Sequence, residues 1–548
     1  MLIFKQSFFM FYILLMLIIL LPALAGIGAF SAKIFKITDL GLSLTILTGV
    51  FCCTILWTVL AFFFPLNVYV EILTIIIGIF FFFHLKNYLL FWRFFSKNAI
   101  SFLVISCITI FFGSYYPFIL DHFGYYVPSI KWLSEVGLVK GICNLDLMLG
   151  QMSLWHVFQA GFSHFADPFL RINVLVLIIY TIYIFDKKFW VHLAFFPVLY
   201  LLVQSPSPDL PVIVFSLIIL NEIFTSNKNA GFLLAYSVFV FAIKPTVLWL
   251  PLFTFLYSFF ILKGKLKSLY FAVAVMLLFL FKNLWTFGFP IFPAQFLDFG
   301  LAWKPNDELL KNSAEVAVRK TFDTKYSYAE IQHFSNWEYF KKWLFLGGIK
   351  GNIHILFVLS LSGFFVFAFL KKSRLVWFLF ISVLIKSVAV FIFSAQYRFF
   401  IEVFFVLFFV LFFELLSKKF ALFIYGALSI FVFAFLTFPS LPKSYFPSFK
   451  LGNYITGFDA NQFYKPSYFA LKKYKTHQIG NLKFNVVDGY IYNFETPIPT
   501  ISPQYIYEDL EAGIFPQLKG KTVKNGFIWR KISPEEKEKL RIILQDFE

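Results

Sequence analysis

Charged side chains stand at the ends of long apolar segments in this sequence. Placing a charge at membrane depth costs about 2.5–3.5 kcal/mol on insertion scales, so such residues are candidates for function. Seven positions share this placement: Asp121, Arg171, Asp209, Lys244, Lys282, Arg398 and Glu402. We take them as the starting set for a candidate site.

Asp121 directly follows an apolar segment and precedes His122, Tyr125 and Tyr126. A carboxylate at the boundary between water and lipid suits a general base. Partial burial and a neighbouring histidine can tune its pKa. The alternative is an interfacial cap surrounded by belt aromatics.

Three cations, Arg171, Lys244 and Arg398, lie at helix ends on the same predicted side. The guanidinium fork matches phosphate oxygens, whereas a snorkelling side chain is the structural alternative. Phosphate binding is favoured for Arg398, because Glu402 lies one turn later on the same face. A structural role fits that pair equally well, and both readings stay open for Lys244, which precedes the helix-breaking Pro245.

Asp209 lies in the short segment SPSPDLP. Its place before Leu-Pro also suits the start of a helix. A site residue and a helix cap therefore both remain open for Asp209.

The composition is that of an integral membrane protein. Of the 548 residues, 60% are hydrophobic and 14% are charged, against about 25% charged in soluble domains. The net charge of +18 comes mostly from short loops, which excludes a nucleic-acid partner as its explanation. No P-loop, GxGxxG, HExxH or nucleophile elbow is present, which argues against ATP hydrolysis and zinc proteolysis.

Apolar runs predict an all-α polytopic membrane protein with about 12–14 spans. Several central runs are only about 14–17 residues long and must be buried among neighbours or lie in thinned bilayer. The fourteen candidate spans are residues 8–30, 38–63, 66–84, 99–118, 171–185, 189–204, 210–224, 231–244, 246–262, 268–284, 352–370, 375–395, 398–416 and 420–438. We divide the chain into N-terminal spans (1–98), a membrane domain (99–438) and a C-terminal domain (439–548).

Lysine and arginine in the short loops predict the orientation, because such loops stay cytoplasmic. If the spans alternate, one side receives Lys33, Lys36, Lys86, Arg93, Lys97, Lys187, Lys188, Lys263, Lys265, Lys267, Lys371, Lys372, Arg374, Lys418 and Lys419. The loops 119–170 and 285–350 and the C-terminal domain then lie outside. We expect a multi-pass protein of a bacterial cytoplasmic membrane whose active face is extracytoplasmic.

The C-terminal domain changes character and predicts a small α+β unit. Alternation in KFNVV and YIYNF indicates short strands. The run SPEEKEKLRIIL predicts a helix capped by Ser533 and Glu536. In the second outer loop, KYSYAEIQHFSNWEYF predicts one surface helix with an aromatic face, either interfacial or covering a site.

The order of these motifs resembles the GT-C glycosyltransferases over residues 100–410. An Asp opens the first large outer loop (Asp121), followed by Tyr125, Tyr126, Lys131 and Trp132. Then come GLVKGICNLDLMLGQMSLWH, the SPSPD turn, the GFPIFP turn, the outer QYRFF and a soluble C-terminal piece. The run IKWLSEVGLVKGICNL most resembles uncharacterised bacterial membrane proteins of that superfamily.

The resemblance implies a GT-C-like helical bundle that moves a sugar from a polyprenyl-phosphate donor to a glycan or lipid acceptor at the bilayer. It makes Asp121 the catalytic base and assigns substrate or phosphate binding to Arg171, Lys244, Arg398, Asp209, His122, Tyr125 and Tyr126. His122 stands where many relatives have a second acid. This weakens the case for a divalent cation, since a single carboxylate is a poor divalent site.

Three other classes remain open. A polysaccharide polymerase also has many spans and a large outer loop, but its loops would be rich in Arg, and 285–350 holds only Arg319. A transporter would show broken, charged midplane helices, whereas the charges here gather at one end. A non-catalytic assembly protein is the third.

Overall fold

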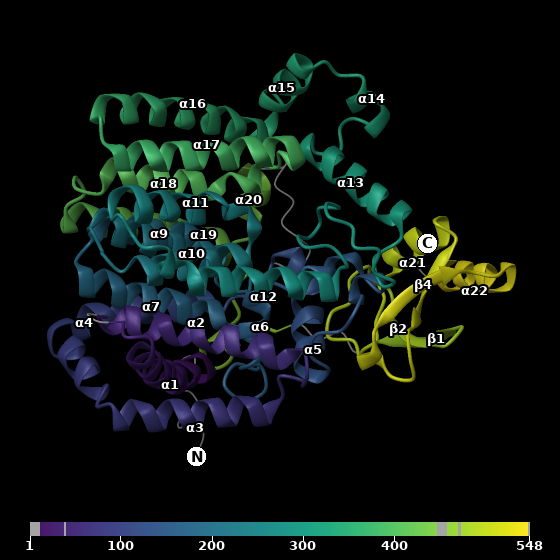
Figure 1. Ribbon diagram of the computed structural model, residues 1–548, viewed down its shortest axis with the longest axis horizontal. Coiled ribbons are helices and arrows are strands. Elements are labelled where there is room, and N and C mark those ends of the chain that lie inside the picture. The colour runs from purple at the N-terminus through teal and green to yellow at the C-terminus, as the bar shows by residue number, and fades with distance from the viewer. Residues whose placement is uncertain (1–10, 38–39, 446–456, 469–472, 546–548) are drawn as a thin grey trace.

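The computed structural model describes residues 11–37, 40–445, 457–468 and 473–545 (Figure 1). It is mostly helical, with a small C-terminal unit at one end of a helical bundle. The predicted fold class, an all-α membrane bundle with an α+β C-terminal segment, is confirmed. Residues 8–10 and 38–39 of the predicted spans, and parts of 439–548, lie outside the described residues.

Seven helices among the described residues are long and apolar enough to cross a membrane, which makes the chain a multi-pass membrane protein. They are α1 (Phe11–Ile34), α2 (Leu42–Ala61), α4 (Tyr88–Gly113), the helix Leu266–Thr286 that contains α12 (Tyr270–Thr286), α16 (Gly348–Lys371), α17 (Arg374–Ser394) and α19 (Lys418–Thr437).

The other seven predicted spans are also helical but shorter. They are α3 (Val68–His84), α7 (Ile172–Lys187), η4 with α8 (Trp190–Phe195, Phe196–Leu199), α9 (Asp209–Phe224), α10 (Ala230–Ile243), α11 with η6 (Trp249–Leu256, Tyr257–Ile261) and α18 (Ile401–Phe412). A helix that is apolar all round needs protein on every side. Accordingly every residue from Leu210 to Ile223 of α9 is buried, whereas only 22% of the most apolar part of α16 is buried. The short helices α7, α9 and α10 lie in the interior of the bundle, whereas α16 and the short helix α3 lie on its outside.

Small residues let the first helices approach closely. A Cβ on Gly28 of α1 would lie 1.8 Å from the Thr45 carbonyl oxygen of α2, and one on Gly26 would lie 1.9 Å from the Gly78 oxygen of α3. Backbones in van der Waals contact supply the packing that lipid-exposed helices otherwise lack. α1 therefore packs tightly between α2 and α3 (Figure 1).

The outer loops carry short helices. The first holds η1 (His122–Tyr126), α5 (Val127–Glu135), η2 (Ile142–Asn144), η3 (Leu147–Gly150) and α6 (Leu154–Ala160), and the second holds α13 (Asp307–Thr321), α14 (Tyr328–Gln332) and α15 (Asn336–Leu344). The predicted single surface helix in KYSYAEIQHFSNWEYF was wrong. Ser327 and Ser335 each begin a separate helix with a capping box, to Glu330 and Glu338.

The C-terminal unit contains two antiparallel hairpins and two helices. β1 (Tyr474–Ile479) pairs with β2 (Leu482–Val487), and β3 (Ile514–Leu518) pairs with β4 (Phe527–Lys531). Between and after them lie α21 (Pro503–Glu511) and α22 (Pro534–Gln545). The KFNVV strand and the Ser533–Glu536 cap of α22 are confirmed, the latter by reciprocal bonds of 3.0 and 3.2 Å.

The strand predicted for YIYNF was wrong. This segment packs on the first outer loop instead of pairing with a strand. The Phe494 amide donates to the Phe123 carbonyl at 3.2 Å, and the two rings lie 4.9 Å apart. Its alternating aromatic residues pack against this loop. Alternation in the sequence does not distinguish such a packed segment from a strand.

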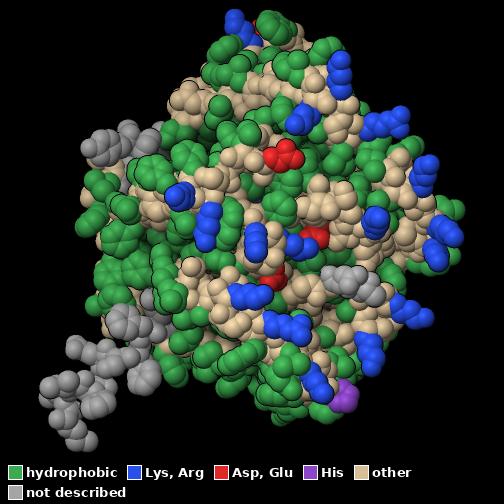
Figure 2. Space-filling model, turned by 90° about the vertical axis from the view of Figure 1, so that its left-hand side faces the viewer, with side chains coloured by type: hydrophobic (Ala, Val, Ile, Leu, Met, Phe, Trp, Pro, Cys, Tyr) green, Lys and Arg blue, Asp and Glu red, His purple; other side chains and the backbone are tan. Residues whose placement is uncertain are grey.

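One end of the bundle is strongly basic. Figure 2 looks onto the left-hand end of Figure 1, where Lys and Arg side chains gather and few Asp or Glu are visible. Lys97 of α4, Lys188 after α7 and Lys418 of α19 lie around one cavity there. The C-terminal unit lies at the opposite end (Figure 1). The assignment of the basic end to the cytoplasm stays a prediction.

Candidate functional site

Asp121 lies at the entry of a distorted helix at the end of the bundle that faces the C-terminal unit. The chain leaves α4 at Gly113, turns through residues 114–119, and forms the five-residue π-helix η1 immediately after Asp121. The π-helix continues into α5 without a break. Short π segments recur at functional sites because they displace side chains from the regular helical faces.

The Asp121 side chain meets Arg398, which is 277 residues away in sequence. Arg398 Nη1 lies 3.5 Å from Asp121 Oδ2, and the two side chains are 45% and 38% exposed. Arg398 belongs to the one-turn helix η8 (Tyr397–Phe399) between α17 and α18. Both groups are therefore accessible to a substrate while they contact each other.

A second ion pair joins Lys244 and Asp209. Asp209 is the first residue of α9, and the Ser207 hydroxyl donates to its carboxylate at 3.3 Å. Lys244 follows α10 in an extended conformation, with φ −150° and ψ 108°, because Pro245 ends that helix. The Lys244 side chain is 15% exposed, so its charge is held at the Asp209 carboxylate.

The Phe399 ring links the two ion pairs. The Arg398 guanidinium carbon lies 5.1 Å from the ring centroid and the Lys244 ammonium lies 5.7 Å from it. Both distances are within the range of cation–π attraction. Asp121, Arg398, Lys244 and Asp209 thus form one group, which we name the charged cluster.

The two carboxyls of the charged cluster differ in pKa. Burial raises the pKa of Asp121 above its ordinary value, the Asp209 charge adds to this, and Arg398 opposes it. Burial also acts to raise the pKa of Asp209, but the Lys244 ammonium outweighs it and the net pKa is lowered. Carboxyls whose environments separate their pKa values are suited to different roles.

Two buried tyrosines interact electrostatically with the charged cluster. Tyr125 and Tyr126 are 9% and 2% exposed, and their rings contact at 4.6 Å. Burial raises both pKa values well above normal, and the Asp121 charge adds to this. Both therefore remain neutral hydroxyls beside Asp121.

The predicted Arg398–Glu402 pair was wrong. Glu402 instead pairs with Lys386 of α17 at 2.6 Å, and both side chains are buried. Lys386 also donates to the Phe399 carbonyl. The pair thereby holds the turn that carries Arg398. Sequence analysis did not include Lys386 among the candidates. The one feature that could have identified it is its charge within an apolar run.

Lys282 is a second buried lysine with a backbone role. Its ammonium donates to the carbonyls of Gln151 and Met152, at 2.5 and 3.1 Å. It ties α12 to the first outer loop and lies apart from the charged cluster's ion pairs.

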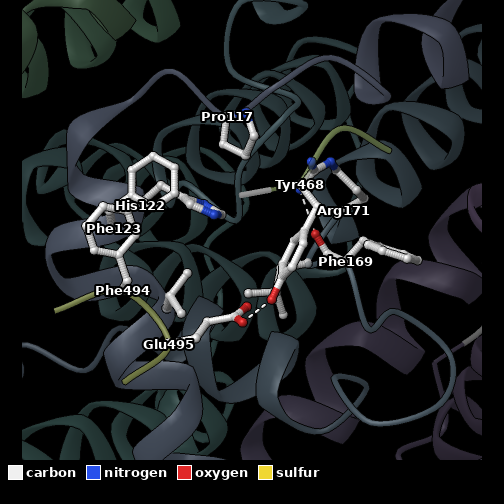
Figure 3. Close-up of a pocket in the computed structure, with 10 residues that line it drawn as sticks. Pro117, His122, Phe123, Phe169, Arg171, Tyr468, Phe494 and Glu495 are labelled. Atoms are coloured by element: carbon white, nitrogen blue, oxygen red, sulfur yellow. Dashed lines mark hydrogen bonds between the residues drawn. The ribbon is translucent and has the colours of Figure 1, made fainter. Parts of the chain in front are cut away.

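His122 and Arg171 line a separate, small cavity (Figure 3). In that view His122 lies on one side and Arg171 on the other, with Tyr468 and Glu495 of the C-terminal segment between them. The volume of about 10 Å³ has room for about one water molecule. It does not have room for a sugar.

Arg171 is 1% exposed, and its guanidinium group donates hydrogen bonds to backbone carbonyls. Its Nε, Nη1 and Nη2 donate to the carbonyls of Gly113, Phe169 and Ser467 at 2.9, 2.6 and 2.7 Å. His122 Nδ1 lies 3.0 Å from the Ser205 hydroxyl, and burial lowers the pKa of His122 well below normal. Arg171 and His122 therefore make contacts within the protein that are typical of structural residues.

The part of the chain that the structure describes contains no group of three or more His, Cys, Asp or Glu side chains placed to hold a metal ion. Asp121 and Asp209 each face a cation of the chain instead.

A family model described as a domain of unknown function (DUF8201) matches residues 10–405. Neither a search of the curated proteins nor one of the solved structures gives a match.

Proposed function

The chain belongs to the DUF8201 family of domains of unknown function, and we propose from its charged cluster that it is a glycosyltransferase. In this proposal it moves a sugar from a polyprenyl-phosphate donor to an extracytoplasmic glycan or lipid acceptor in cell-envelope assembly. The observation that carries the proposal is the contact of a partly exposed carboxyl of raised pKa, Asp121, with Arg398, beside a second cation, Lys244.

The reaction needs a base and a stabiliser of negative charge, and the charged cluster supplies both. Asp121 takes the proton of the acceptor hydroxyl. The acceptor oxygen forms a bond to the anomeric carbon of the sugar, while the bond from that carbon to the phosphate oxygen breaks. The electron pair leaves with the phosphate, whose charge Arg398 and Lys244 stabilise.

The net charge of the charged cluster changes during the proposed step, and this change favours binding of the leaving phosphate. Before reaction two carboxylates offset two cations. When Asp121 takes up the proton, Arg398 loses its anionic partner and faces the departing phosphate. The guanidinium therefore binds the phosphate more strongly as the sugar–phosphate bond breaks, which is when the extra charge develops.

We limit the proposed phosphate contacts to Lys244 and Arg398. Arg171 donates to three carbonyls around a cavity of about 10 Å³, so we leave it out of the phosphate-binding set. Lys244 and Arg398 remain. Tyr125 and Tyr126 are buried, neutral hydroxyl groups that interact electrostatically with Asp121.

The test is a comparison of Asp121→Asn with Asp323→Asn in cells that make the surface glycan. Asp323 lies in the second outer loop, is exposed, and is also ion-paired, to Lys350. The two variants therefore undergo the same chemical change at different places. With equal membrane levels, Asp121→Asn should lose most of the surface glycan, since a general base contributes roughly 10²–10⁴-fold.

Asp323→Asn should keep the wild-type glycan. Normal glycan in the Asp121→Asn strain would remove Asp121 from catalysis and with it the proposed function.

A further inference from the structure

A cavity of about 470 Å³ opens at the basic end of the bundle, opposite the charged cluster. Its wall comes from residues 95–101 of α4, the end of α7, the start of η4 and the first residue of α19. The lining residues are Phe95, Ser96, Lys97, Asn98, Ala99, Ile100, Ser101, Phe185, Lys188, Trp190 and Lys418. No acidic side chain is among them.

Three lysines from three separate segments converge on this cavity. Lys97 lies in α4, Lys188 ends α7 with a left-handed φ of 60°, and Lys418 begins α19. Within the described residues none of the three forms an ion pair. The adjacent Lys187 differs, since it pairs with Glu222 at 2.8 Å.

Trp190 provides a ring at the same cavity. The Lys418 ammonium lies 4.6 Å from that ring's centroid. Tryptophan gathers at the level of lipid headgroups, where its ring is apolar and its N–H is polar. The cavity thus combines unpaired cations with a residue typical of the membrane interface.

An apolar track continues from the cavity along α4. Ile100 lines the cavity and is 80% exposed, and Leu103 and Val104 are 54% and 55% exposed. Their spacing of three and four residues puts them on one helix face. A ligand seated among the lysines would find an apolar surface leading away from them.

We propose that this cavity binds the phosphate of an anionic phospholipid headgroup. Lys97, Lys188 and Lys418 hold the phosphate, and the acyl chains lie along the α4 face. Basic pockets between membrane helices on the cytoplasmic side bind such headgroups. The bound lipid connects α4, α7 and α19, and the binding is independent of the proposed glycosyl transfer.

The test uses the full chain purified in detergent, with dioleoyl phosphatidylglycerol or zwitterionic dioleoyl phosphatidylcholine added. Native mass spectrometry counts the lipids retained. The test variant is Lys97→Gln with Lys188→Gln and Lys418→Gln. The matched control is Lys263→Gln with Lys265→Gln and Lys267→Gln, which removes the same charge outside the cavity.

We expect wild type and control to retain phosphatidylglycerol in preference to phosphatidylcholine. The test variant should bind phosphatidylglycerol roughly 100-fold more weakly, from about fivefold per lysine. Equal retention by test and control variants would overturn the proposal.

A soluble phosphate shares the headgroup's chemistry, so one arm adds millimolar inorganic phosphate. Retention that survives this competition supports a lipid ligand. Displacement of the lipid by inorganic phosphate would assign the cavity to a free phosphate and overturn the lipid assignment.

Discussion

At the scale of single residues, two carboxyls of the same kind take opposite roles. Asp121 and Asp209 lie in one cluster, but Asp121 faces Arg398 at 3.5 Å, whereas Asp209 has Lys244 in direct contact and the Ser207 hydroxyl. Burial therefore dominates at Asp121 and raises its pKa, while Lys244 dominates at Asp209. In the proposed reaction Asp121 exchanges the proton and Asp209 holds Lys244.

Asp209→Asn should move the acidic limb of the activity profile to lower pH. Removing the Asp209 charge takes away one cause that raises the Asp121 pKa, and it leaves Lys244, which lowers that pKa, without its partner. A base of lower pKa stays ionised further into acid. The measurement is kcat/KM against pH. The apparent pKa of the acidic limb is determined separately from the maximal value of kcat/KM.

Asp323→Asn is the control for that profile and should leave the limb in place. A limb that stays unchanged or moves to higher pH in Asp209→Asn would contradict the electrostatic coupling of the two carboxyls.

Sequence could predict the members of the charged cluster but not their pairing. Asp121, Asp209, Lys244 and Arg398 were identifiable because charges at the ends of apolar helices are few. Their partners were not, because 277 and 35 residues separate the paired positions. Helical spacing instead favoured a pair between Arg398 and Glu402. Glu402 pairs with the buried Lys386 in its place.

At the scale of elements, α17 and α18 are joined through one buried ion pair. Lys386 is 1% exposed and Glu402 8% in their side chains, and Lys386 also donates to the Phe399 carbonyl of η8. Two interior charges are tolerated because each has the other. The pair fixes the geometry of the turn that presents Arg398 and Phe399.

Lys386→Leu and Glu402→Leu should each destabilise the protein by about 3–5 kcal/mol, since each leaves one buried charge without its partner. The double variant should recover most of that loss. Thermal unfolding in detergent measures the stability of all three. Two single losses that simply add in the double variant would show that the two side chains do not depend on each other.

Activity should behave differently from stability in the double variant. The Phe399 carbonyl no longer has its lysine donor, so the turn that carries Arg398 is less well held. Donor turnover should stay low although stability returns, whereas full recovery of both would remove the positioning role of Lys386.

The positions of the helices were more predictable than how deeply each helix is buried. Apolar runs predict all fourteen helical segments because a membrane requires every backbone group to be bonded within its own helix. The same runs do not reveal that α9 is buried from Leu210 to Ile223 while α16 lies largely outside. Nor did alternation in residues 490–494 distinguish a strand from a segment that packs its aromatics on η1.

At the scale of the whole molecule, the C-terminal unit is fastened to the first outer loop by polar contacts. The Lys131 ammonium donates to the Glu495 carbonyl at 2.8 Å, and Lys524 donates to the Val136 carbonyl at 3.0 Å. Asn493 donates to the buried Asp146 carboxyl at 3.3 Å. The unit therefore borders the segment that carries Asp121.

The docking of this unit should weaken as pH rises through about 7. Burial raises the pKa of Asp146 to about 7, against the opposing bond from the Met148 amide. A carboxyl whose folded pKa is raised contributes stability that is present below its ordinary pKa and is lost as pH rises through the raised one. Protection of α21 from hydrogen exchange, corrected for intrinsic rates, should be roughly tenfold or more lower at pH 8 than at pH 5.

Asp146→Asn cannot ionise, so its protection should change little over that range. The same pH dependence in Asp146→Asn and wild type would place the titrating group elsewhere.

The most direct test of the proposed function uses the purified protein in lipid nanodiscs with a panel of polyprenyl-phosphate hexoses and pentoses and a membrane lipid extract as acceptor. Mass spectrometry measures the free polyprenyl phosphate released. Wild type and Asp323→Asn should release it from at least one donor, and Asp121→Asn should do so at least about 100-fold more slowly. Release by Asp121→Asn at the wild-type rate, or no release from any donor by wild type, would contradict a glycosyltransferase built on Asp121.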